Sequence, residues 1–414
     1  MLDIQFIRDN AKLVKDKARQ KNIDVDIEEL LKRDESRRGL LKQAEDLRRQ
    51  RNELSAKNKG QKPDGETIKK GKELREKIDK LESALLELEA SYQTLLRDVP
   101  NIFPDDTPVG DEGSNQEISK HGTADKKHVK DHLSWGEEKG YIDFERGAKV
   151  AGNKFYYIKG ALVELEMACM QLAMNIALKH GFSPMTVPHL VNEKTINGTG
   201  FSPRGEEDQI YKIEGEDLNL IATSEIPITG YHSGEILDKQ NLPLLYAGIS
   251  PAYRKEAGAY GKHSKGLFRV HQFNKVELYI FCEPIESEKW HQKLVEIEEE
   301  LCKSLEIPYR LVRIASGDLG APAYKKYDIE YWSPVENAYR ELMSCSNVTD
   351  YQARRLNVRY RDEANKLQFV HTLNATAMAF SRTAIALIEN HQDEEGQVKV
   401  PKALQKYMGE KTKI

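Results

Sequence analysis

A heptad repeat in the first quarter of the chain constrains the fold more than any other feature. Apolar residues follow alternating steps of four and three, the spacing of a coiled-coil seam, at Leu74, Ile78, Leu81, Leu85, Leu88, Tyr92, Leu95 and Val99. A weaker version of the spacing runs through Leu40, Ala44, Leu47, Arg51 and Leu54. Gly and Pro residues interrupt both stretches over 58–65, so the chain should reverse there and form an antiparallel helical hairpin.

This hairpin should be long, and its outer half should be basic. A helix over 66–97 would extend about 48 Å, which is too long for a domain of ordinary radius to cover. We therefore expect it to project into solvent. Its basic residues are Arg48, Arg49, Arg51, Lys57, Lys59, Lys62, Lys69, Lys70 and Lys72. They suit a phosphate backbone, but taken alone such charge runs more often only keep a coiled coil solvated.

Beyond the hairpin, the sequence predicts a second and larger domain. A Pro-, Gly- and Asp-rich stretch over 99–122 reads as a linker, which gives domains over 1–104 and 105–414. Helices are expected at 161–180 and 377–391, and strands at 182–190, 244–254, 268–283, 309–314 and 327–332. The strands do not alternate strictly with helices, so we predict an α+β domain with a largely antiparallel sheet.

Charge and cysteine usage exclude several classes of protein. The net charge of −4 argues against a histone-like nucleic-acid binder, because such proteins need a large excess of Lys and Arg. Cys169, Cys282, Cys302 and Cys345 form no Cys-x-x-Cys pair, which favours a reducing compartment. No basic leader precedes an apolar stretch, and no apolar run approaches the roughly 20 residues of a membrane span. We expect a cytoplasmic protein without membrane association.

Arginine forks are the best candidates for binding a nucleotide. The sequence contains neither Gly-x-x-x-x-Gly-Lys-Ser/Thr nor a Gly-x-Gly-x-x-Gly after a strand. Guanidinium groups can hold phosphate oxygens without a glycine loop. Arg254 and Glu256 close one β-rich segment, and a Gly- and Lys-rich loop over 257–267 leads to the next. In a strand over 268–283, the period of two would bring Arg269, His271, Phe273 and Glu277 to one face.

These blocks resemble the motifs of class II aminoacyl-tRNA synthetases. The stretch 254–277 resembles motif 2, which implies that Arg254 binds the α-phosphate, Glu256 contacts adenine, Phe273 stacks on it and Arg269 binds phosphate. Arg382, in Ala-Phe-Ser-Arg-Thr, matches the arginine of motif 3. The stretch 161–190 with Pro188 resembles motif 1, which implies a homodimer.

Within this class the chain most resembles the seryl-tRNA synthetases, over essentially its whole length. Thr223-Ser224-Glu225, the 254–277 block, the stretches 340–347 and 352–355, and 372–376 carry the likeness. It implies an antiparallel-sheet catalytic domain behind a hairpin that binds tRNA(Ser), with tRNA(Sec) left open. It also implies an L-serine pocket of Thr223, Ser224, Glu225, Glu277 and Thr376, and catalytic roles for Arg254, Arg269 and Arg382. ATP would contact Arg254, Lys255, Glu256, Phe273, Glu341, Leu342, Met343, Ser344 and Arg382, with Mg²⁺ on Glu341 and Ser344.

The expected chemistry suits these residue types. The ammonium of serine needs a buried carboxylate such as Glu277, and its hydroxyl needs polar partners such as Thr223 and Glu225. Attack of the serine carboxylate on the α-phosphorus needs no protein nucleophile, so positioning and charge neutralisation should suffice and we expect no catalytic base. Where bacterial members often carry Asn-Gly-Ser/Thr-Gly, this chain has 374–377 as Asn-Ala-Thr-Ala, which retains the hydroxyl.

Two alternatives and several simpler interpretations stay open. The chain could activate a small amino acid for a carrier protein, or it could be a degenerate synthetase kept as an RNA-binding scaffold. The basic hairpin argues against the first, and the presence of Arg254, Glu277 and Arg382 argues against the second. A zinc site at His128 and His132 lacks a third ligand nearby. His271 and Cys345 are interpreted as structural residues.

Overall fold

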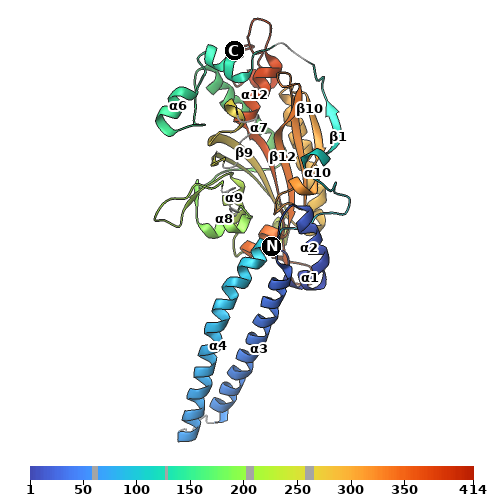
Figure 1. Cartoon of the computed structure of the whole chain (residues 1–414). Helices are drawn as coiled ribbons and strands as arrows, with labels where there is room; N and C mark the ends of the chain where they lie inside the picture. Colours follow the sequence, from blue (N-terminus) through green and yellow to red (C-terminus); the bar gives the residue numbers. More distant parts are fainter. Residues whose placement is uncertain (58–63, 126–128, 202–208, 257–264) are drawn as a thin grey trace. The chain divides into compact units, whose positions relative to one another are not determined.

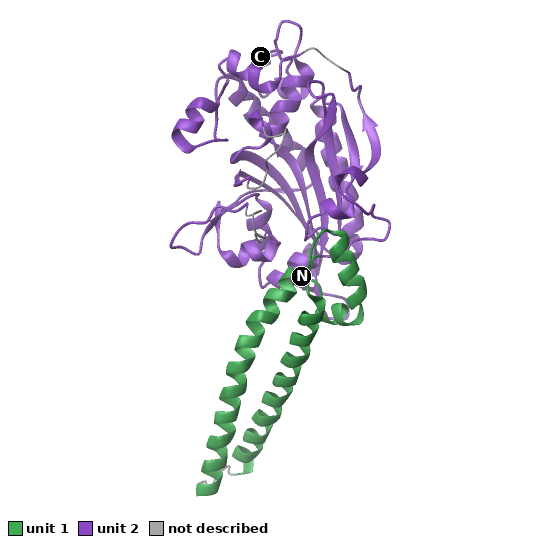
Figure 2. Ribbon diagram, viewed as in Figure 1, with its two compact units in different colours: residues 1–100 green, residues 101–414 purple. Residues whose placement is uncertain are grey.

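The chain divides into two compact units in a computed structural model that describes residues 1–57, 64–125, 129–201, 209–256 and 265–414. The first unit covers residues 1–100 and the second residues 101–414 (Figure 2). Most of the expected hairpin turn, with Lys59 and Lys62, lies outside the described residues. The same holds for His128 and for residues 257–264 of the Gly- and Lys-rich loop.

The first unit is helical. Its described helices are α1 (Ile4–Asp9), α2 (Ala11–Gln20), α3 (Ile27–Lys57) and α4 (Gly65–Asp98) (Figure 1). Asp64 caps α4 by accepting a hydrogen bond from the backbone N–H of Thr67 at 2.8 Å. The two long helices run antiparallel and are joined by ion pairs, including Arg48 with Glu82 at 2.6 Å. This arrangement confirms the predicted hairpin.

The heptad positions form the seam between α3 and α4. Leu74, Ile78 and Tyr92 are buried, and Leu81, Leu85, Leu88 and Leu95 are half-buried. Leu86, which falls outside the repeat, is 74% exposed. The apolar spacing therefore identified the inward face correctly, because residues that recur at this spacing stay on one side of a helix. On α3, Arg51 is exposed although it falls in the weaker repeat.

A mainly antiparallel sheet forms the centre of the second unit. In the described residues its eight strands follow the order β1-β10-β11-β12-β15-β9-β8-β4, and only the β4–β8 pair is parallel. This confirms the predicted α+β class. The strands are β1 (Gln116–His121), β4 (Ser183–Thr186), β8 (Leu244–Tyr253), β9 (Gln272–Cys282), β10 (Tyr309–Arg313), β11 (Lys325–Ser333), β12 (Ala338–Thr349) and β15 (His371–Ala379).

Helices cover both faces of this sheet, and β9 shows why. Its even-numbered residues, such as Leu278 and Ile280, pack into a core shared with α7 (Ala161–Lys179), α10 (Ser287–Ser304) and α12 (Phe380–His391). Its odd-numbered Tyr279 and Phe281 pack into a second core with α8 (Glu193–Thr199), α9 (Glu225–Tyr231) and α11 (Tyr351–Leu356). A strand buried on both faces is apolar throughout, so polar residues within it mark a special site.

Smaller elements complete the described part of the second unit. They are α5 (His132–Glu138), α6 (Phe144–Ala151) and α13 (Lys402–Gln405), with short strands β2 (Ile142–Asp143), β3 (Tyr157–Ile158), β5 (Leu190–Val191), β6 (Asn219–Leu220), β7 (Ile236–Leu237), β13 (Arg359–Arg361) and β14 (Leu367–Phe369). Among the described helices, α7 alone is long and apolar enough to cross a membrane. Residues such as Leu165, Cys169 and Ala173 of α7 are buried against the sheet and its helices, which accounts for that composition.

Three predicted boundaries were wrong. The final helix begins at Phe380 instead of 377, because residues 377–379 extend β15, in which Met378 and Ala379 pair with β9. The strand expected at 268–283 begins at Gln272, because residues 266–268 form a 3-10 turn, η4 (Gly266–Phe268). The segment 182–190 is split into β4 and the start of β5, with Pro188, which has no N–H for a ladder, between them.

Candidate active site

A cavity opens beside the middle strands of the sheet. About 540 Å³ of space in and around its mouth, part of it open to solvent, is free of protein atoms. The residues that line it come from the end of β8, from η4 and β9, from β12 and β15, and from the first turn of α12. They are Arg254, Glu256, Phe268, Val270, Phe273, Lys275, Glu341, Leu342, Ser344, Thr376, Ala379, Ser381 and Arg382.

Two arginines each lie against an aromatic ring in this cavity. The Arg254 guanidinium carbon is 5.3 Å from the centre of the Phe273 ring, and that of Arg382 is 4.8 Å from the Phe268 ring. The Arg254 Nε donates to the carbonyl oxygen of Ala222 at 3.3 Å. Burial lowers the pKa of Arg254, but an arginine remains charged at any physiological pH. The cavity therefore combines fixed positive charge with flat apolar surfaces, which suits a nucleotide.

Glu341 supplies the opposing charge. Its Oε1 lies 2.9 Å from Arg382 Nη1. Burial alone would raise the pKa of Glu341, but Arg382 and then Lys326 lower it to about 2, so the carboxylate is ionised. A β-bulge in the pairing of β12 with β11 falls at this point, which helps Glu341, Leu342 and Ser344 all line the cavity despite the usual alternation.

Glu341 and Ser344 fit a magnesium site only in part. Both offer oxygen, the ligand that Mg²⁺ prefers, and Glu341 carries the negative charge. Within the described residues, no three His, Cys, Asp or Glu side chains gather closely enough to form a complete metal cage. A Mg²⁺ ion here would take its remaining ligands from water and from phosphate oxygens, as this ion usually does.

A buried polar cluster lies next to the cavity, around Lys275. Lys275 ion-pairs with Glu277, which is fully buried, and its ammonium donates to Thr223 Oγ1 at 3.3 Å. Asn374 Nδ2 donates to Glu277 Oε1 at 3.1 Å. Thr376 stands opposite Glu277 in the β15–β9 ladder and also lines the cavity. The cluster can therefore present a carboxylate and two hydroxyls to a small amphoteric ligand.

Glu225 extends this cluster into the first turn of α9. It is buried, and its Oε1 accepts a hydrogen bond from Gln352 Nε2 at 2.8 Å. Gln352 Oε1 in turn accepts from the hydroxyls of Tyr279 and Thr372, each at 2.8 Å. Burial, followed by the charge of Glu277, raises the pKa of Glu225 to about 7. This carboxyl can therefore either donate or accept a hydrogen bond near neutral pH.

Most of the residues expected at the site converge. The cavity lining includes Arg254, Glu256, Phe273, Glu341, Leu342, Ser344, Thr376 and Arg382, while Thr223 and Glu277 contact Lys275, which itself lines the cavity. Glu256 has a left-handed backbone, with φ of 48°, which is uncommon outside glycine and is frequent at functional sites.

Seven of the expected residues are absent from the cavity lining: Thr223, Glu225 and Glu277 belong to the buried polar cluster, and the other four lie elsewhere. Arg269 precedes β9 and pairs with Glu256 Oε2 at 3.2 Å, with 40% of its side chain exposed. The prediction that it shares a strand face with Phe273 was therefore wrong, as it was for His271, whose ring contacts the Arg254 carbonyl oxygen. Lys255 is half-buried, Met343 is in the core, and Ser224 bonds the Gly248 carbonyl oxygen at 3.3 Å. Their roles stay predictions.

The sequence reasoning missed Lys275, Phe268 and Ser381. Lys275 could have been found, because it lies between Phe273 and Glu277 at strand spacing and interrupts an otherwise apolar strand. Phe268 and Ser381 line the cavity because η4 and α12 pack together there, and a single sequence carries no local signal for that packing. Cys345, by contrast, is buried as predicted, and burial raises the pKa of its thiol well above the ordinary value.

Comparison with known proteins places this geometry in context. Residues 1–103 match the model of the seryl-tRNA synthetase N-terminal domain, and residues 210–391 match the class II tRNA synthetase core domain for G, H, P, S and T. The chain is 44% identical to a serine–tRNA ligase of Treponema denticola over 99% of both chains. It is 46% identical to that of Dictyoglomus thermophilum, over 99% of this chain and 98% of the relative.

Comparison with solved structures leads to the same group of proteins. The fold is similar to that of seryl-tRNA synthetase from Pyrococcus horikoshii complexed with ATP, with a TM-score of 0.91, 41% identity and coverage of 100% of this chain and 99% of the other. Prolyl-tRNA synthetase from Giardia lamblia in complex with prolyl-adenylate has a TM-score of 0.57 at 16% identity, over 66% of this chain and 55% of the other, so it shares the fold alone.

Proposed function

The chain belongs to the seryl-tRNA synthetase family, and we propose how its residues divide the work of that family's reaction. Its activity is that of a serine–tRNA ligase: it activates L-serine with ATP and transfers the seryl group to tRNA(Ser). In the first step the serine carboxylate attacks the α-phosphorus of ATP and pyrophosphate leaves. In the second step a terminal ribose hydroxyl of the tRNA attacks the seryl carbonyl carbon and AMP leaves.

ATP is proposed to bind between the two arginine–aromatic pairs. Arg254 neutralises the α-phosphate and Phe273 stacks on adenine, while Arg382 binds the outer phosphates. Arg269 is assigned as a second phosphate ligand, because its ion pair with Glu256, which lines the cavity, places its guanidinium nearby. Glu256, Lys255 and the stretch 341–344 complete the contacts. The observation that carries this assignment is that Arg254 and Arg382 line the same cavity. Two guanidinium groups fixed in one cavity can stabilise the negative charge that develops on phosphate during the reaction.

Mg²⁺ is proposed to bind at Glu341 and Ser344. When bound there, the ion would neutralise phosphate charge and orient the leaving pyrophosphate. Glu341 also holds Arg382 in place through their 2.9 Å ion pair. Its low pKa keeps it ionised throughout the physiological range, so the site needs no proton to be released before a cation binds.

Serine is proposed to bind over the Lys275 cluster. Glu277 would receive its ammonium, and Thr223, Glu225 and Thr376 would bond its hydroxyl and position it, with Ser224 supporting this loop. Without serine, Lys275 neutralises the fully buried Glu277, which would otherwise be costly to keep ionised. Alanine and glycine would leave the polar groups of the pocket unpaired, which disfavours them strongly.

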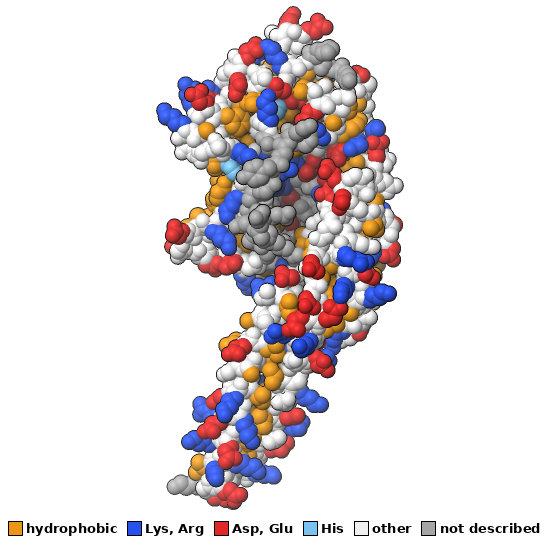
Figure 3. Space-filling model, viewed as in Figure 1, with side chains coloured by type: hydrophobic (Ala, Val, Ile, Leu, Met, Phe, Trp, Pro, Cys, Tyr) orange, Lys and Arg blue, Asp and Glu red, His pale blue; other side chains and the backbone are white. Residues whose placement is uncertain are grey.

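The helical unit is proposed to bind the tRNA, as an arm over 1–104 that precedes a catalytic domain over 105–414 in the chain. Lys57, Lys69, Lys70 and Lys72 are exposed, and within the described chain none of these four forms an ion pair. Figure 3 shows Lys and Arg side chains along the outer hairpin, with Asp and Glu between them. Such a surface reads the shape and backbone of an RNA more than its bases. If tRNA(Sec) is also a substrate, we expect it to bind the same surface of the arm.

A homodimer in the cytoplasm is also proposed. The outward stripe of α7 carries apolar side chains, with Met167 69% and Leu178 46% exposed, which suits a contact between two copies. This is the helix that resembles motif 1. Four buried cysteines without a disulfide fit a reducing compartment.

Serine-dependent exchange of labelled pyrophosphate into ATP, without tRNA, tests the catalytic assignment. Serine should support exchange, whereas threonine, alanine, glycine and cysteine should support little. Arg382→Ala should abolish it. If serine supports exchange but tRNA(Ser) is not charged, the acceptor is another molecule, such as a carrier protein. No exchange from folded protein would favour the scaffold alternative.

A further inference from the structure

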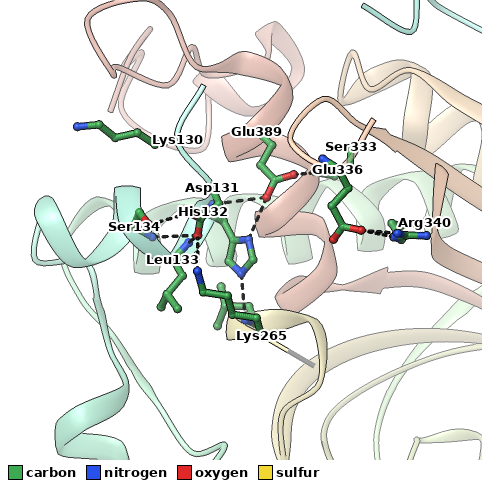
Figure 4. Close-up of polar contacts among 12 residues, drawn as sticks. Lys130, Asp131, His132, Leu133, Ser134, Lys265, Ser333, Glu336, Arg340 and Glu389 are labelled. Atoms are coloured by element: carbon green, nitrogen blue, oxygen red, sulfur yellow. Dashed lines mark hydrogen bonds and ion pairs between the residues drawn. The ribbon is translucent and has the colours of Figure 1, made fainter. Parts of the chain in front are cut away.

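A histidine outside the nucleotide cavity ties together the two elements that form one of its walls. His132 begins α5, and its side chain is buried among α5, η4 and α12 (Figure 4). Its Nδ1 lies 3.0 Å from Glu389 Oε1 on α12. Its Nε2 accepts a hydrogen bond from the backbone N–H of Leu267 in η4 at 3.2 Å. One imidazole thus links two segments that are distant in sequence.

These contacts determine which nitrogen of the His132 ring carries the proton. Because Nε2 accepts from an amide, it carries no proton in this arrangement, and the ring proton lies on Nδ1, where it is donated to Glu389. Both oxygens of Glu389 are engaged, since Oε2 accepts from the Ser333 hydroxyl at 2.8 Å. Glu389 is buried, so neither side chain can rotate freely.

The two linked segments carry the Phe268–Arg382 wall. Phe268 follows Leu267 directly, so the bond to the Leu267 amide holds the turn that presents its ring. Arg382 and Glu389 are seven residues apart on α12, which places them on the same side of the helix, two turns apart. His132 therefore joins the Phe268 turn to the side of α12 that also carries Arg382.

Gly266 supports this interpretation independently. Its φ is 60°, a left-handed conformation that glycine adopts readily. A β-carbon at this position would lie 2.3 Å from His132 Nε2, well inside contact distance. The turn can approach the imidazole only because residue 266 has no side chain. A second, weaker tether joins Lys265 Nζ to Asp131 Oδ1 at 3.9 Å.

We propose that His132 is a positioning residue that holds the Phe268 turn against α12 and so shapes the ATP-binding wall. This rests on the proposed role of Arg382 in binding ATP. Among the described residues, His132 is not part of the cavity lining, and its hydrogen bonds go to Glu389 and Leu267 and not to the buried cluster around Lys275. Its loss should therefore weaken ATP binding while leaving serine binding intact. A residue needed only for folding would show no such selectivity.

The test uses variants that each keep one of the two hydrogen bonds of the His132 side chain. The KM for ATP and the KM for serine are measured for each variant in pyrophosphate exchange. Asn places its amide near the position of Nδ1, so His132→Asn keeps the Glu389 bond and loses the Leu267 bond. Gln can place its oxygen near Nε2, so His132→Gln keeps an acceptor for Leu267. We expect the ATP KM to rise about tenfold in H132N, the effect of one buried hydrogen bond, and about threefold in H132Q. The serine KM should change less than twofold in both.

Two further variants complete the design. His180→Asn is the matched control, because His180 also contacts a glutamate, Glu300 at 2.7 Å, but outside this cluster; it should leave both constants unchanged. Gly266→Ala should raise the ATP KM selectively, and it decides the matter if neither His132 variant folds. Equal rises for ATP and serine, or an unchanged ATP KM in folded variants, would overturn the proposal. If Arg382→Ala still supports exchange, with an unchanged ATP KM, the assigned ATP site itself is wrong.

Discussion

Replacing Glu225 with Gln should change how the stability of the catalytic unit depends on pH. Glu225 is buried, and burial followed by Glu277 raises its pKa from 4.5 to about 7. Folding therefore favours the protonated carboxyl. The stability that this preference contributes is complete below pH 4.5 and is lost as the pH rises toward 7. Gln never ionises, and its oxygen can keep the 2.8 Å hydrogen bond from Gln352.

The size of the effect follows from the pKa difference. A shift of about 2.5 units corresponds to about 3 kcal/mol across the whole window, of which about 2 kcal/mol falls between pH 5 and 7.5. Over that interval the unfolding free energy of the unmodified protein should fall by about 2 kcal/mol relative to Glu225→Gln. Other titrating groups are common to both proteins, so they largely cancel in the difference.

Urea unfolding followed by tryptophan fluorescence measures this difference. All three tryptophans, Trp135, Trp290 and Trp332, lie in the second unit, so the signal reports on that unit and not on the helical arm. Glu216→Gln is the control, since Glu216 is exposed and its replacement should leave the pH dependence unchanged. A stability difference that stays constant from pH 5 to 7.5, or that changes with the opposite sign, would refute the reasoning.

Three further predictions concern catalysis, tRNA binding and assembly. Arg254→Ala should lower the exchange rate constant about 10²- to 10³-fold with folding retained, as measured by pyrophosphate exchange and thermal melting; a loss below tenfold contradicts its assigned role. Replacing Lys69, Lys70 and Lys72 together with Ala should leave serine-dependent exchange intact and weaken aminoacylation of tRNA(Ser), most strongly at low salt, where the release of counterions contributes most to binding; equal losses in both assays would argue against the arm. Met167→Asp should shift the protein toward monomer in sedimentation experiments, whereas an unchanged mass would place the contact elsewhere.

Local periodicity determined much of this protein. The seam residues Leu74, Ile78 and Tyr92 could be identified because heptad spacing depends only on neighbours along one helix. The same holds for Phe273 and Glu277, which share a strand face by the period of two. The resemblance of short motifs to a known family indicated the residues of the nucleotide cavity, of which Arg254, Glu341 and Arg382 do converge.

Only the tertiary structure decided the remaining features. The strand over 338–349 was not predicted, because its polar residues face a buried site and hide the alternation that marks a strand. The last helix begins late because pairing with β9 holds residues 377–379 in β15. The contact of His132 with Leu267 spans 135 residues, and that of Glu225 with Gln352 spans 127. Such contacts depend on which strands and helices become neighbours, and residues so far apart leave no periodic pattern in a single sequence.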